Sequence, residues 1–350
     1  MKILITGNMG YVGPSVVRQL RASYPEACLV GVDLGLFSAC LMPHDFLPEL
    51  RLDQQLFADV RRLPADLLDG VDAIVHLAAI SNDPIGNIYE DVTMEINHRA
   101  TVALAERAKK AGVASFVFAS SCSVYGSAQE ADRTEDSPLG PLTAYARSKA
   151  LSEQDLKGLA GDGFTVTCPR FATACGMSER LRLDLVLNDF VAGAVASRQI
   201  TILSDGTPWR PLINVKDMAR AFAWAVGRAP SLGGDFLAVN VGPEHGNYQV
   251  RELAEAVARI VPGVSVQINQ DAPPDKRSYR VNFDLFRKLA PLHQPLHDLD
   301  RSISELKEGL ETLNFNDESF RSSLFMRLVQ LNHLREKGLL SETLKWNIEA

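Results

Sequence analysis

The sequence predicts an α/β protein built on a doubly wound parallel sheet, with a smaller, discontinuous C-terminal domain. Short apolar runs alternate with longer amphipathic segments through the first half of the chain. A glycine-rich turn follows the first apolar run, and the alternation loosens beyond Thr173. Strands buried on both faces and separated by helix-length segments are typical of a parallel sheet covered by helices on both sides.

The expected elements follow from these apolar runs in order. The expected strands cover residues 3–6, 28–33, 56–60, 72–79, 115–121 and 164–171. The amphipathic segments 16–23, a stretch ending near Ala111, and one ending near Leu159 are expected to be helices. Shorter strands are expected at 200–203 and 236–240. In the C-terminal part, Leu324, Leu328 and Leu331 form a helical stripe that we expect to pack onto the body.

Composition limits the classes of partner. The 350 residues include 46% hydrophobic residues, enough for a sizeable core, and carry a formal charge of −7. That charge gives no general attraction to nucleic acid or to anionic lipid, so neither partner is expected. The five cysteines lack CxxC spacing, which favours free thiols in a reducing compartment, and no metal site is predicted. No apolar run is long enough for a signal-peptide core or a membrane span, so a cytoplasmic protein is expected.

The glycine-rich turn reads TGNMGYVG and opens a helix. Gly7 can make the tight turn, Gly10 can let the backbone approach a diphosphate, and Gly13 can let helix and strand pack closely. Tyr11 and Val12 lie at the N-terminus of the helix, which favours negative charge. The spacing is GxxGxxG and could be an ordinary turn, but this context favours the Rossmann arrangement for a dinucleotide.

Carboxylates at later strand ends support that interpretation. Asp33 ends the second strand, where it can hydrogen-bond the adenosine ribose hydroxyls and repel a 2′-phosphate, which favours NAD over NADP. Asp59 and Val60 are placed to meet the adenine, and the backbone of Leu77, Ala78 and Ala79 can line the dinucleotide. Each signal alone is weak, because strand ends often carry aspartate.

Tyr145 and Lys149 form the sharpest chemical signal. Residues four apart share one face of a helix, so the Lys149 ammonium can lie near the Tyr145 phenol. A nearby cation favours the phenolate, whose ordinary pKa of about 10 must fall before tyrosine serves as a base near neutrality. Lys149 can also hold the nicotinamide ribose. Upstream, Ser120 and Ser121 end a strand, where a serine can hydrogen-bond a reacting oxygen.

Taken together, these residues resemble the extended short-chain dehydrogenase/reductases, in their nucleotide-sugar epimerase and dehydratase branch. The resemblance follows TGNMGYVG, Asp33, ADV, HLAA, INHRAT, SSCSVYG, YARSK and WRPLINVKDMARA over almost the whole chain. It implies bound NAD and a homodimer formed through the helices that contain Asn97 and Tyr145. It also implies a dinucleotide-binding domain at 1–172, to which 212–242 returns. The segments 173–211 and 243–350 would form the substrate-binding domain and C-terminal helices.

The resemblance also assigns roles to individual residues. Ser121, Tyr145 and Lys149 would be the catalytic residues, and Asn97 would be a polar bridge to the active site that contacts the cofactor. Nucleotide-sugar contacts are implied for a further set, namely Ser121, Thr173, Asn188, Arg210 and Arg277. For the two arginines the physical reason is clear, because guanidinium groups match phosphate oxygens bidentately.

Departures from the family narrow the reaction. The 4,6-dehydratases of this branch carry Asp-Glu directly after the catalytic hydroxyl, where this chain has Cys122 and Ser123. The 3,5-epimerases use a cysteine two positions after that hydroxyl, where this chain has Ser123. Thr173 replaces an asparagine that often meets the substrate, so the sugar stays undetermined. The loop from 34 to 54 is long and apolar, and covers the cofactor or supports a dimer.

The resulting hypothesis is an NAD-dependent nucleotide-sugar epimerase that works through a transient keto sugar. The alternative is an NAD(P)-dependent ketoreductase or dehydrogenase of the same substrates. A dinucleotide-sensing protein without chemistry is the third possibility, but such proteins usually lack part of the Ser-Tyr-Lys set that is intact here. The sequence leaves open the nucleotide, the sugar and the ring carbon.

Overall fold

A parallel sheet forms the centre of the larger lobe in the computed structural model, which describes residues 1–43, 46–81, 83–127, 131–269 and 277–347. Its strands run in the order β3-β2-β1-β4-β5-β7-β11, and the short β6 pairs with β7. Every pairing among these strands is parallel, which confirms the predicted doubly wound sheet. In chain order the bounds are β1 Lys2–Thr6, β2 Cys28–Asp33, β3 Gln54–Phe57, β4 Ala73–His76, β5 Ser115–Phe118, β6 Ser120–Ser121, β7 Thr165–Phe171 and β11 Phe236–Val241.

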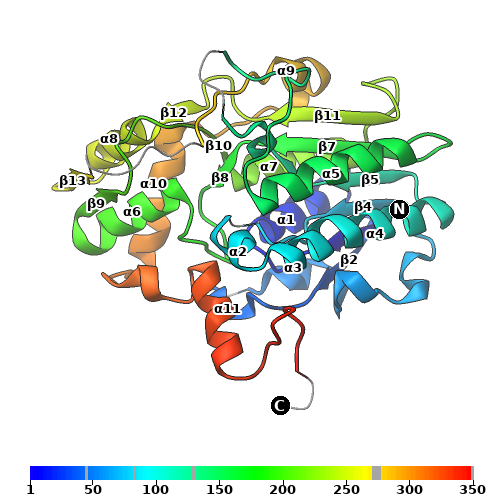
Figure 1. Ribbon diagram of the computed structural model, residues 1–350, viewed down its shortest axis with the longest axis horizontal. Helices are drawn as coiled ribbons and strands as arrows, with labels where there is room; N and C mark the ends of the chain where they lie inside the picture. Colours follow the sequence, from blue (N-terminus) through cyan, green and yellow to red (C-terminus); the bar gives the residue numbers. More distant parts are fainter. Residues whose placement is uncertain (44–45, 82, 128–130, 270–276, 348–350) are drawn as a thin grey trace.

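Helices cover both faces of this sheet (Figure 1). Alternate side chains of each strand point to opposite faces, so Ile3 and Ile5 pack with α1 and α7, whereas Leu4 packs with α4 and α5. The short helices α2 and α3 and a π-helical turn lead into α4 and contact α5. The bounds are α1 Gly13–Ser23, α2 Asp83–Ile88, α3 Glu90–Met94, the π-helical turn Glu95–Arg99, α4 Ala100–Lys110, α5 Ala144–Leu159, α7 Val215–Val226 and α9 Asp284–Leu289.

A smaller lobe carries its own hydrophobic core beside the carboxyl edge of the sheet (Figure 1). It contains the small sheets β12-β10-β8 and β13-β9 and the helices α6, α8 and α10. Within 212–242, β10 ends in this lobe, whereas α7 and β11 join the larger one. The bounds are β8 Thr173–Cys175, α6 Val186–Ser197, β9 Gln199–Ile202, β10 Trp209–Asn214, β12 Asn247–Gln249, α8 Val250–Ile260, β13 Ser265–Ile268 and α10 Leu299–Thr312.

Polar side chains at helix starts explain where several helices begin. Asn214 accepts a hydrogen bond from Lys216 N at the start of α7, and Asp298 accepts one from Arg301 N at the start of α10. Gln249 and Glu252 form a capping box on α8. Short 3-10 helices lie at Ser38–Cys40, Pro48–Arg51, Val60–Arg62, Ala65–Leu68, Cys122–Tyr125, Pro291–His293 and Phe320–Ser322.

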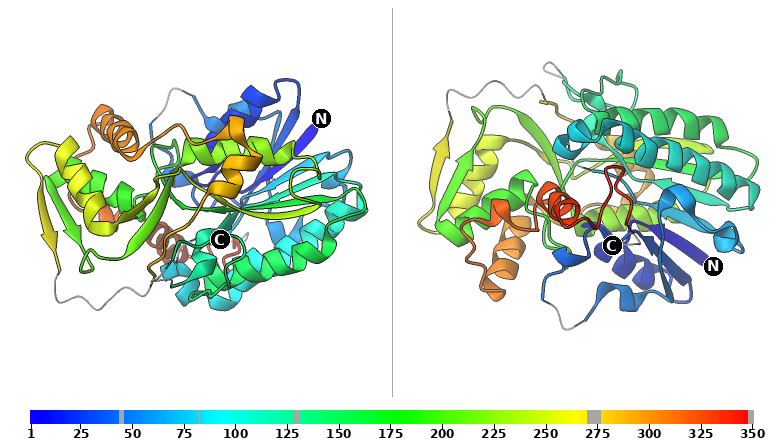
Figure 2. Two further views of the ribbon diagram at one scale, coloured as in Figure 1. Left: turned by 90° about the horizontal axis from the view of Figure 1, so that it is seen from above. Right: turned by 60° about the horizontal axis from the view of Figure 1, so that its bottom comes forward.

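The C-terminal helix α11 (Arg327–Glu336) returns to the larger lobe and lies beside the loop that follows β2 (Figure 2). Leu331 is fully buried there with Leu36 and Ile80. The expected packing of a C-terminal stripe is therefore confirmed for Leu331, although Leu324 lies before the helix begins. The loop after β2 lines the central cavity with its first residues, while Met42 packs into the core of the smaller lobe.

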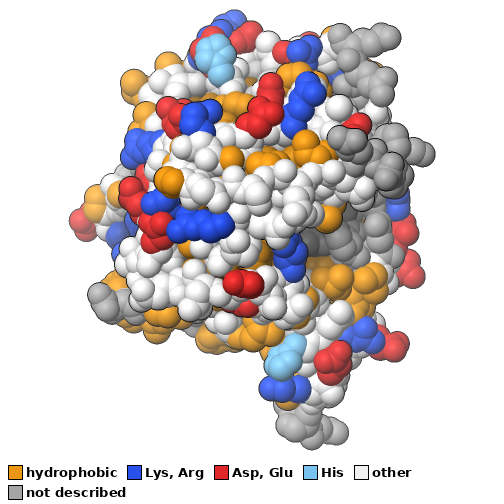
Figure 3. Space-filling model, turned by 90° about the vertical axis from the view of Figure 1, so that its left-hand side faces the viewer, with side chains coloured by type: hydrophobic (Ala, Val, Ile, Leu, Met, Phe, Trp, Pro, Cys, Tyr) orange, Lys and Arg blue, Asp and Glu red, His pale blue; other side chains and the backbone are white. Residues whose placement is uncertain are grey.

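The surface facing the viewer in Figure 3 interleaves acidic and basic side chains, without a single large patch of either sign. Among the described residues, no helix combines the length and apolar character needed to cross a lipid bilayer.

Candidate active site

The strand order reverses between β1 and β4, and the glycine-rich turn opens at this point of the sheet. In doubly wound sheets ligands bind at the carboxyl edge where the order reverses. A cavity of about 1050 Å³ begins at this edge and extends between the two lobes. Drug-sized ligands occupy roughly 300–1,000 Å³, so this space suits a larger ligand or two adjacent ones.

Two glycines of the turn are required by the fold, and the third is not. Gly7 has φ +75°, and a Cβ there would meet the backbone nitrogen of Ala78 at 2.5 Å. A Cβ on Gly13 would meet the carbonyl oxygen of Asn8 at 2.0 Å, so the start of α1 lies too close to the turn after β1 for a side chain. Gly10 is different, because only the Gly7 carbonyl, at 3.2 Å, lies near its missing Cβ. Its bare backbone faces the cavity, which fits a close approach by a diphosphate.

Asp33 lies at the end of β2 and lines the cavity. Its carboxylate accepts hydrogen bonds from Gly35 N at 2.7 Å and Met9 N at 3.0 Å, which fix its orientation. Burial raises the pKa of Asp33, and these two backbone donors oppose the rise. The carboxylate is thus held in place where ribose hydroxyls can add further hydrogen bonds.

Asp59 also lines the cavity, but its environment differs from the one the sequence predicts. Strand β3 ends at Phe57, and Asp59 caps the next 3-10 turn by accepting from Arg61 N at 2.9 Å. The Arg61 guanidinium also donates to both carboxylate oxygens, with the closest contact at 2.6 Å. Asp59 is therefore paired within the protein before any adenine arrives.

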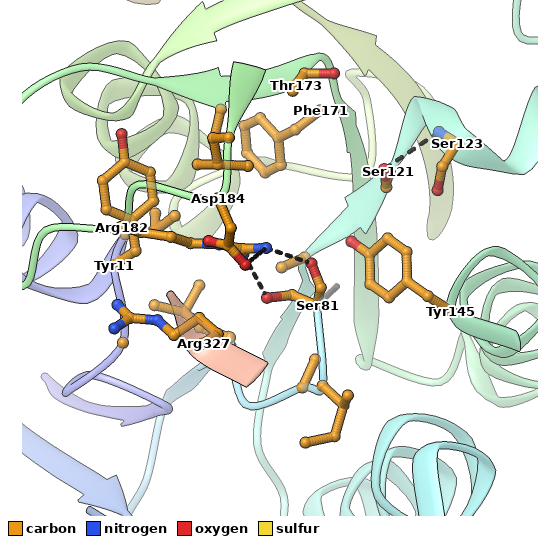
Figure 4. A pocket seen from close by; sticks show the side chains of 18 of the residues that line it. Tyr11, Ser81, Ser121, Ser123, Tyr145, Phe171, Thr173, Arg182, Asp184 and Arg327 are labelled. Atoms are coloured by element: carbon orange, nitrogen blue, oxygen red, sulfur yellow. Dashed lines mark hydrogen bonds and ion pairs between the residues drawn. The ribbon is translucent and has the colours of Figure 1, made fainter. Parts of the chain in front are cut away.

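The three predicted catalytic residues meet at one wall of the same cavity. Ser121 comes from β6, and Tyr145 and Lys149 come from the first turns of α5. Figure 4 shows the Ser121 hydroxyl and the Tyr145 phenol directed toward the same part of the cavity. The Lys149 ammonium lies 5.7 Å from the centre of the Tyr145 ring and 4.5 Å from the centre of the Phe118 ring. A cation so placed favours the ionised phenol.

Lys149 is only 3% exposed, and burial lowers its pKa to about 7. Glu153, one turn further along α5, opposes that shift. Its carboxylate is itself paired with Arg170, whose Nη2 donates at 2.6 Å. Lys149 therefore changes protonation within the physiological range of pH in the protein alone.

The residues after Ser121 occupy two different environments. Cys122 is fully buried, donates to the Arg170 carbonyl at 3.1 Å and has a raised pKa because of burial, so it points away from the cavity as expected. Ser123 lines the cavity, and its buried hydroxyl has no hydrogen-bond partner in the described structure.

Two predicted residues do not reach the cavity. Asn97 is fully buried in the π-helical turn, where it exchanges hydrogen bonds of 2.8 and 2.9 Å with the Ile80 backbone and donates to Ser148 Oγ at 3.1 Å. It bridges the β4 loop to α5 and does not line the cavity. Its hydrogen-bonding groups are already satisfied by the protein.

Asn188 is likewise fully buried, in the first turn of α6. Its amide donates to the Tyr11 hydroxyl at 2.9 Å and to the Arg182 carbonyl at 2.8 Å, and it accepts from Gly176 N. Asn188 therefore does not line the cavity. It instead connects the glycine-rich turn to the smaller lobe.

The remaining predicted residues all line the cavity. They are Gly7, Gly10, Tyr11, Val12, Gly13, Asp33, Asp59, Val60, Leu77, Ala78, Ala79, Ser121, Tyr145, Lys149, Thr173, Arg210 and Arg277.

The structure also adds charged residues that sequence reasoning missed. Arg182 and Asp184 come from the segment before α6, and Figure 4 shows Arg182 bonded to both Asp184 and Ser81. The alternating run RLRLD is the signal that could have found this pair. Arg327, from the start of α11, lines the cavity without any motif that marks it.

Comparisons with known proteins match most of the chain. A family model described as "NAD dependent epimerase/dehydratase family" matches residues 3–242. An uncharacterised UDP-glucose epimerase, YtcB, of Bacillus subtilis is 30% identical over 254 residues, covering 69% of this chain and 77% of that protein. A dTDP-glucose 4,6-dehydratase of Streptomyces griseus is 29% identical over 250 residues, covering 66% of this chain and 73% of that protein.

Among solved structures, MoeE5 in complex with UDP-glucose and NAD superposes with a TM-score of 0.76 at 23% identity. The match covers 89% of this chain and 99% of that one. At this identity the likeness concerns the fold, which is shared almost from end to end.

Proposed function

The chain belongs to the NAD-dependent epimerase/dehydratase family, and on that premise we propose that it is an NAD-dependent nucleotide-sugar epimerase. One observation supports this above the others. Ser121, Tyr145 and Lys149 line the same cavity as the glycine-rich turn, so an acid/base group and a dinucleotide site share one space. The bare Gly10 backbone is consistent with bound NAD there.

The chemistry that bound NAD supplies is the reversible uptake of hydride from the carbon that carries a sugar hydroxyl. Tyr145, as phenolate, takes the proton of that hydroxyl, so the alcohol becomes a ketone and no charge is left on its oxygen. Ser121 donates a hydrogen bond to the same oxygen, and Lys149 stabilises the phenolate. With NAD bound, the ketone would turn over and be reduced on its opposite face, and Tyr145 would return the proton to its oxygen. The product has the same mass and the inverted configuration.

Two features favour epimerisation over the dehydratase chemistry of the Streptomyces griseus relative. Elimination of water needs an acid and a base beyond Tyr145, and Cys122 and Ser123 carry no carboxyl group at the positions after Ser121. Cys122 is also buried away from the cavity. A separate feature favours epimerisation over net reduction. The fixed Asp33 carboxylate favours NAD over its 2′-phosphorylated form, and net reductases more often use the phosphorylated form.

The substrate in this proposal is a nucleoside diphosphate sugar. Arg210 and Arg277 line the cavity and offer guanidinium groups to its diphosphate. Thr173 begins β8 and lines the same cavity. In sequence it lies between the catalytic residues and these arginines, and in our proposal it faces the sugar. The enzyme would work in the cytoplasm, because its cysteines are all free thiols.

The proposal is tested by incubating the purified protein with UDP-, dTDP-, GDP- and CDP-sugars in D₂O. Direct return of hydride predicts a product of inverted configuration with no deuterium on carbon, detected by NMR and mass spectrometry. Carbon-bound deuterium would indicate enolisation, as in a dehydratase or a 3,5-epimerase. A product changed by two mass units would indicate net oxidation or reduction. The absence of any product with every sugar would favour a dinucleotide-sensing protein.

A further inference from the structure

Arg327 is a buried cation with an unused donor. It is 3% exposed, and its Nη1 has no hydrogen-bond partner in the described structure. Its Nη2 donates to the Arg180 carbonyl at 3.1 Å, and its guanidinium lies 4.5 Å from the centre of the Phe37 ring. Among the described residues no carboxylate forms an ion pair with it.

The surroundings of Arg327 leave its charge uncompensated. Asp184 is the nearby acid, but its carboxylate already accepts from Arg182 Nε at 2.6 Å. The Cys40 thiol is also close, yet burial raises its pKa, so it stays neutral and is a weak acceptor. An unpaired buried charge is expensive, and the expense falls when an anion binds beside it.

Arg327 lines the cavity next to the glycine-rich turn. Figure 4 shows its guanidinium on the same side as Tyr11, a residue of that turn, with Arg182 nearby. Burial raises the pKa of the Tyr11 phenol, and the Arg182 and Arg327 guanidinium groups oppose that rise. The N-terminus of α1 begins at Gly13 with no acidic residue in its first turn. The glycine-rich turn, the start of α1 and the Arg327 side chain therefore line the same cavity.

We propose that Arg327 donates a hydrogen bond to the diphosphate of bound NAD, and that residues 327–347 close over the adenosine half of the cofactor. This inference rests on NAD occupying the cavity, not on the reaction that follows. Arg327 lies near the C-terminus of the sequence, whereas the glycine-rich turn lies near its N-terminus. The diphosphate would thus be held by both ends of the protein.

The rest of this C-terminal segment is anchored to the residues that line the adenosine side. Trp346 Nε1 donates to the Leu34 carbonyl at 2.7 Å, directly after Asp33. Arg61, the partner of Asp59, donates to the Thr343 carbonyl at 2.7 Å. Fully buried Leu344 packs in the same cluster as Leu36 and Ile80.

These contacts have a consequence for cofactor exchange. Release of NAD would require both the guanidinium contact and the packing of the segment to break. The segment therefore favours an enzyme that keeps its cofactor between turnovers.

The test compares Arg327→Gln with the parent protein, both freed of cofactor, by isothermal titration calorimetry with NAD, ADP and adenosine. A lost hydrogen bond to a charged group should weaken binding of NAD and ADP by roughly 10- to 100-fold. Adenosine has no phosphate, so its affinity should not change. Lys337→Gln is the matched control, because it removes a positive charge from an exposed part of the same segment and should leave all three affinities unchanged.

Two results would overturn the assignment. One is parental affinity for NAD and ADP in Arg327→Gln, and the other is an equal loss for adenosine, which would indicate a packing defect. If Arg327→Gln does not fold, Arg327→Lys replaces it, and retained adenosine binding with weakened ADP binding is again the expected result. Binding is measured without a sugar, so failure of the proposed epimerase activity leaves this test intact.

Discussion

Lys149 illustrates how burial sets the behaviour of a single residue in this site. Its pKa falls from 10.5 to about 7 because the ammonium is taken out of water. Between these two values the unfolded chain binds a proton that the folded chain releases. The contribution of Lys149 to the free energy of unfolding therefore rises as the pH increases from about 7 to 10.5. The cost of burying the charged ammonium is largest below pH 7.

We expect Lys149→Met to remove this dependence in the cofactor-free protein. Relative to the parent, the variant should gain free energy of unfolding at pH 6, and the gain should shrink by up to roughly 3 kcal/mol by pH 9. Urea unfolding at both pH values measures the difference. Lys157→Met, on the exposed side of the same helix, is the control. A gain that is the same at both pH values would contradict the assigned shift.

Tyr145 is the proposed base, so its hydroxyl is the atom to remove. Tyr145→Phe should lower kcat by about 10²- to 10⁴-fold, because the alcohol then keeps its proton as hydride leaves. NAD affinity should change little, since the phenyl ring and Lys149 remain. Steady-state kinetics and calorimetry check the two parts. Tyr24→Phe removes a hydroxyl that bonds Ala223 O outside the cavity and should retain activity. Parental kcat in Tyr145→Phe would rule out the role.

At the scale of elements, the turn between β1 and α1 separates structural from binding glycines. Gly13→Ala places a Cβ 2.0 Å from a backbone oxygen, so it should lower the free energy of unfolding by about 3 kcal/mol. Gly10→Ala meets only one atom, at 3.2 Å, so it should fold almost normally but bind NAD more weakly. Chemical denaturation and NAD titration distinguish the two effects. Unchanged NAD affinity in Gly10→Ala would show that the diphosphate does not approach this position.

The start of α5 controls the position of both proposed catalytic side chains on that helix. Thr143 Oγ1 accepts from Ala146 N at 3.2 Å and caps the helix two residues before Tyr145. Thr143→Ala should lower the free energy of unfolding by about 1 kcal/mol and also reduce kcat, because the first turn frays. Thr143→Ser keeps the hydroxyl and should restore most of both. Denaturation and kinetics on the pair of variants measure this, and equal defects in the serine variant would argue against capping as the cause.

The elements of the main sheet were predictable because their signals are local. Each buried strand is an apolar run, and α5 ends at Leu159 as its pattern indicates. The packing of α11 against the loop after β2 was not predictable. It depends on contacts such as the hydrogen bond from Gln330 Nε2 to the Leu36 carbonyl, which joins residues 294 apart in the sequence. A strong local pattern predicts that one face of a helix is buried, but it does not predict which element covers that face.

The site was predictable to a similar extent. Residues fixed by strand ends and helix spacing, such as Asp33 and Lys149, line the cavity. Asn188 was carried over by position in a motif, but it is buried, whereas its neighbour Asp189 on α6 does line the cavity. Arg327 was missed because a single arginine in a polar stretch has no spacing rule. Three-dimensional burial is what distinguishes it.

At the scale of the whole molecule, we predict a homodimer formed through α4 and α5. Leu151 on α5 is 39% exposed in the single chain and would be covered in such an interface. Light scattering should give the mass of two chains for the parent and of one chain for Leu151→Glu. Leu292→Glu, at an 84% exposed leucine next to α9, should stay dimeric. A parent protein with the mass of one chain would disprove the dimer.

Closure of the nucleotide pocket by residues 327–347 also bears on the order of events during translation. The glycine-rich turn leaves the ribosome early, whereas Arg327 is added more than 300 residues later. At typical synthesis speeds this interval lasts roughly 15 to 60 s. Throughout that time the nascent chain presents the proposed diphosphate-binding turn without the proposed Arg327 contact. On this proposal, capture of the coenzyme becomes tight only after synthesis has passed α11.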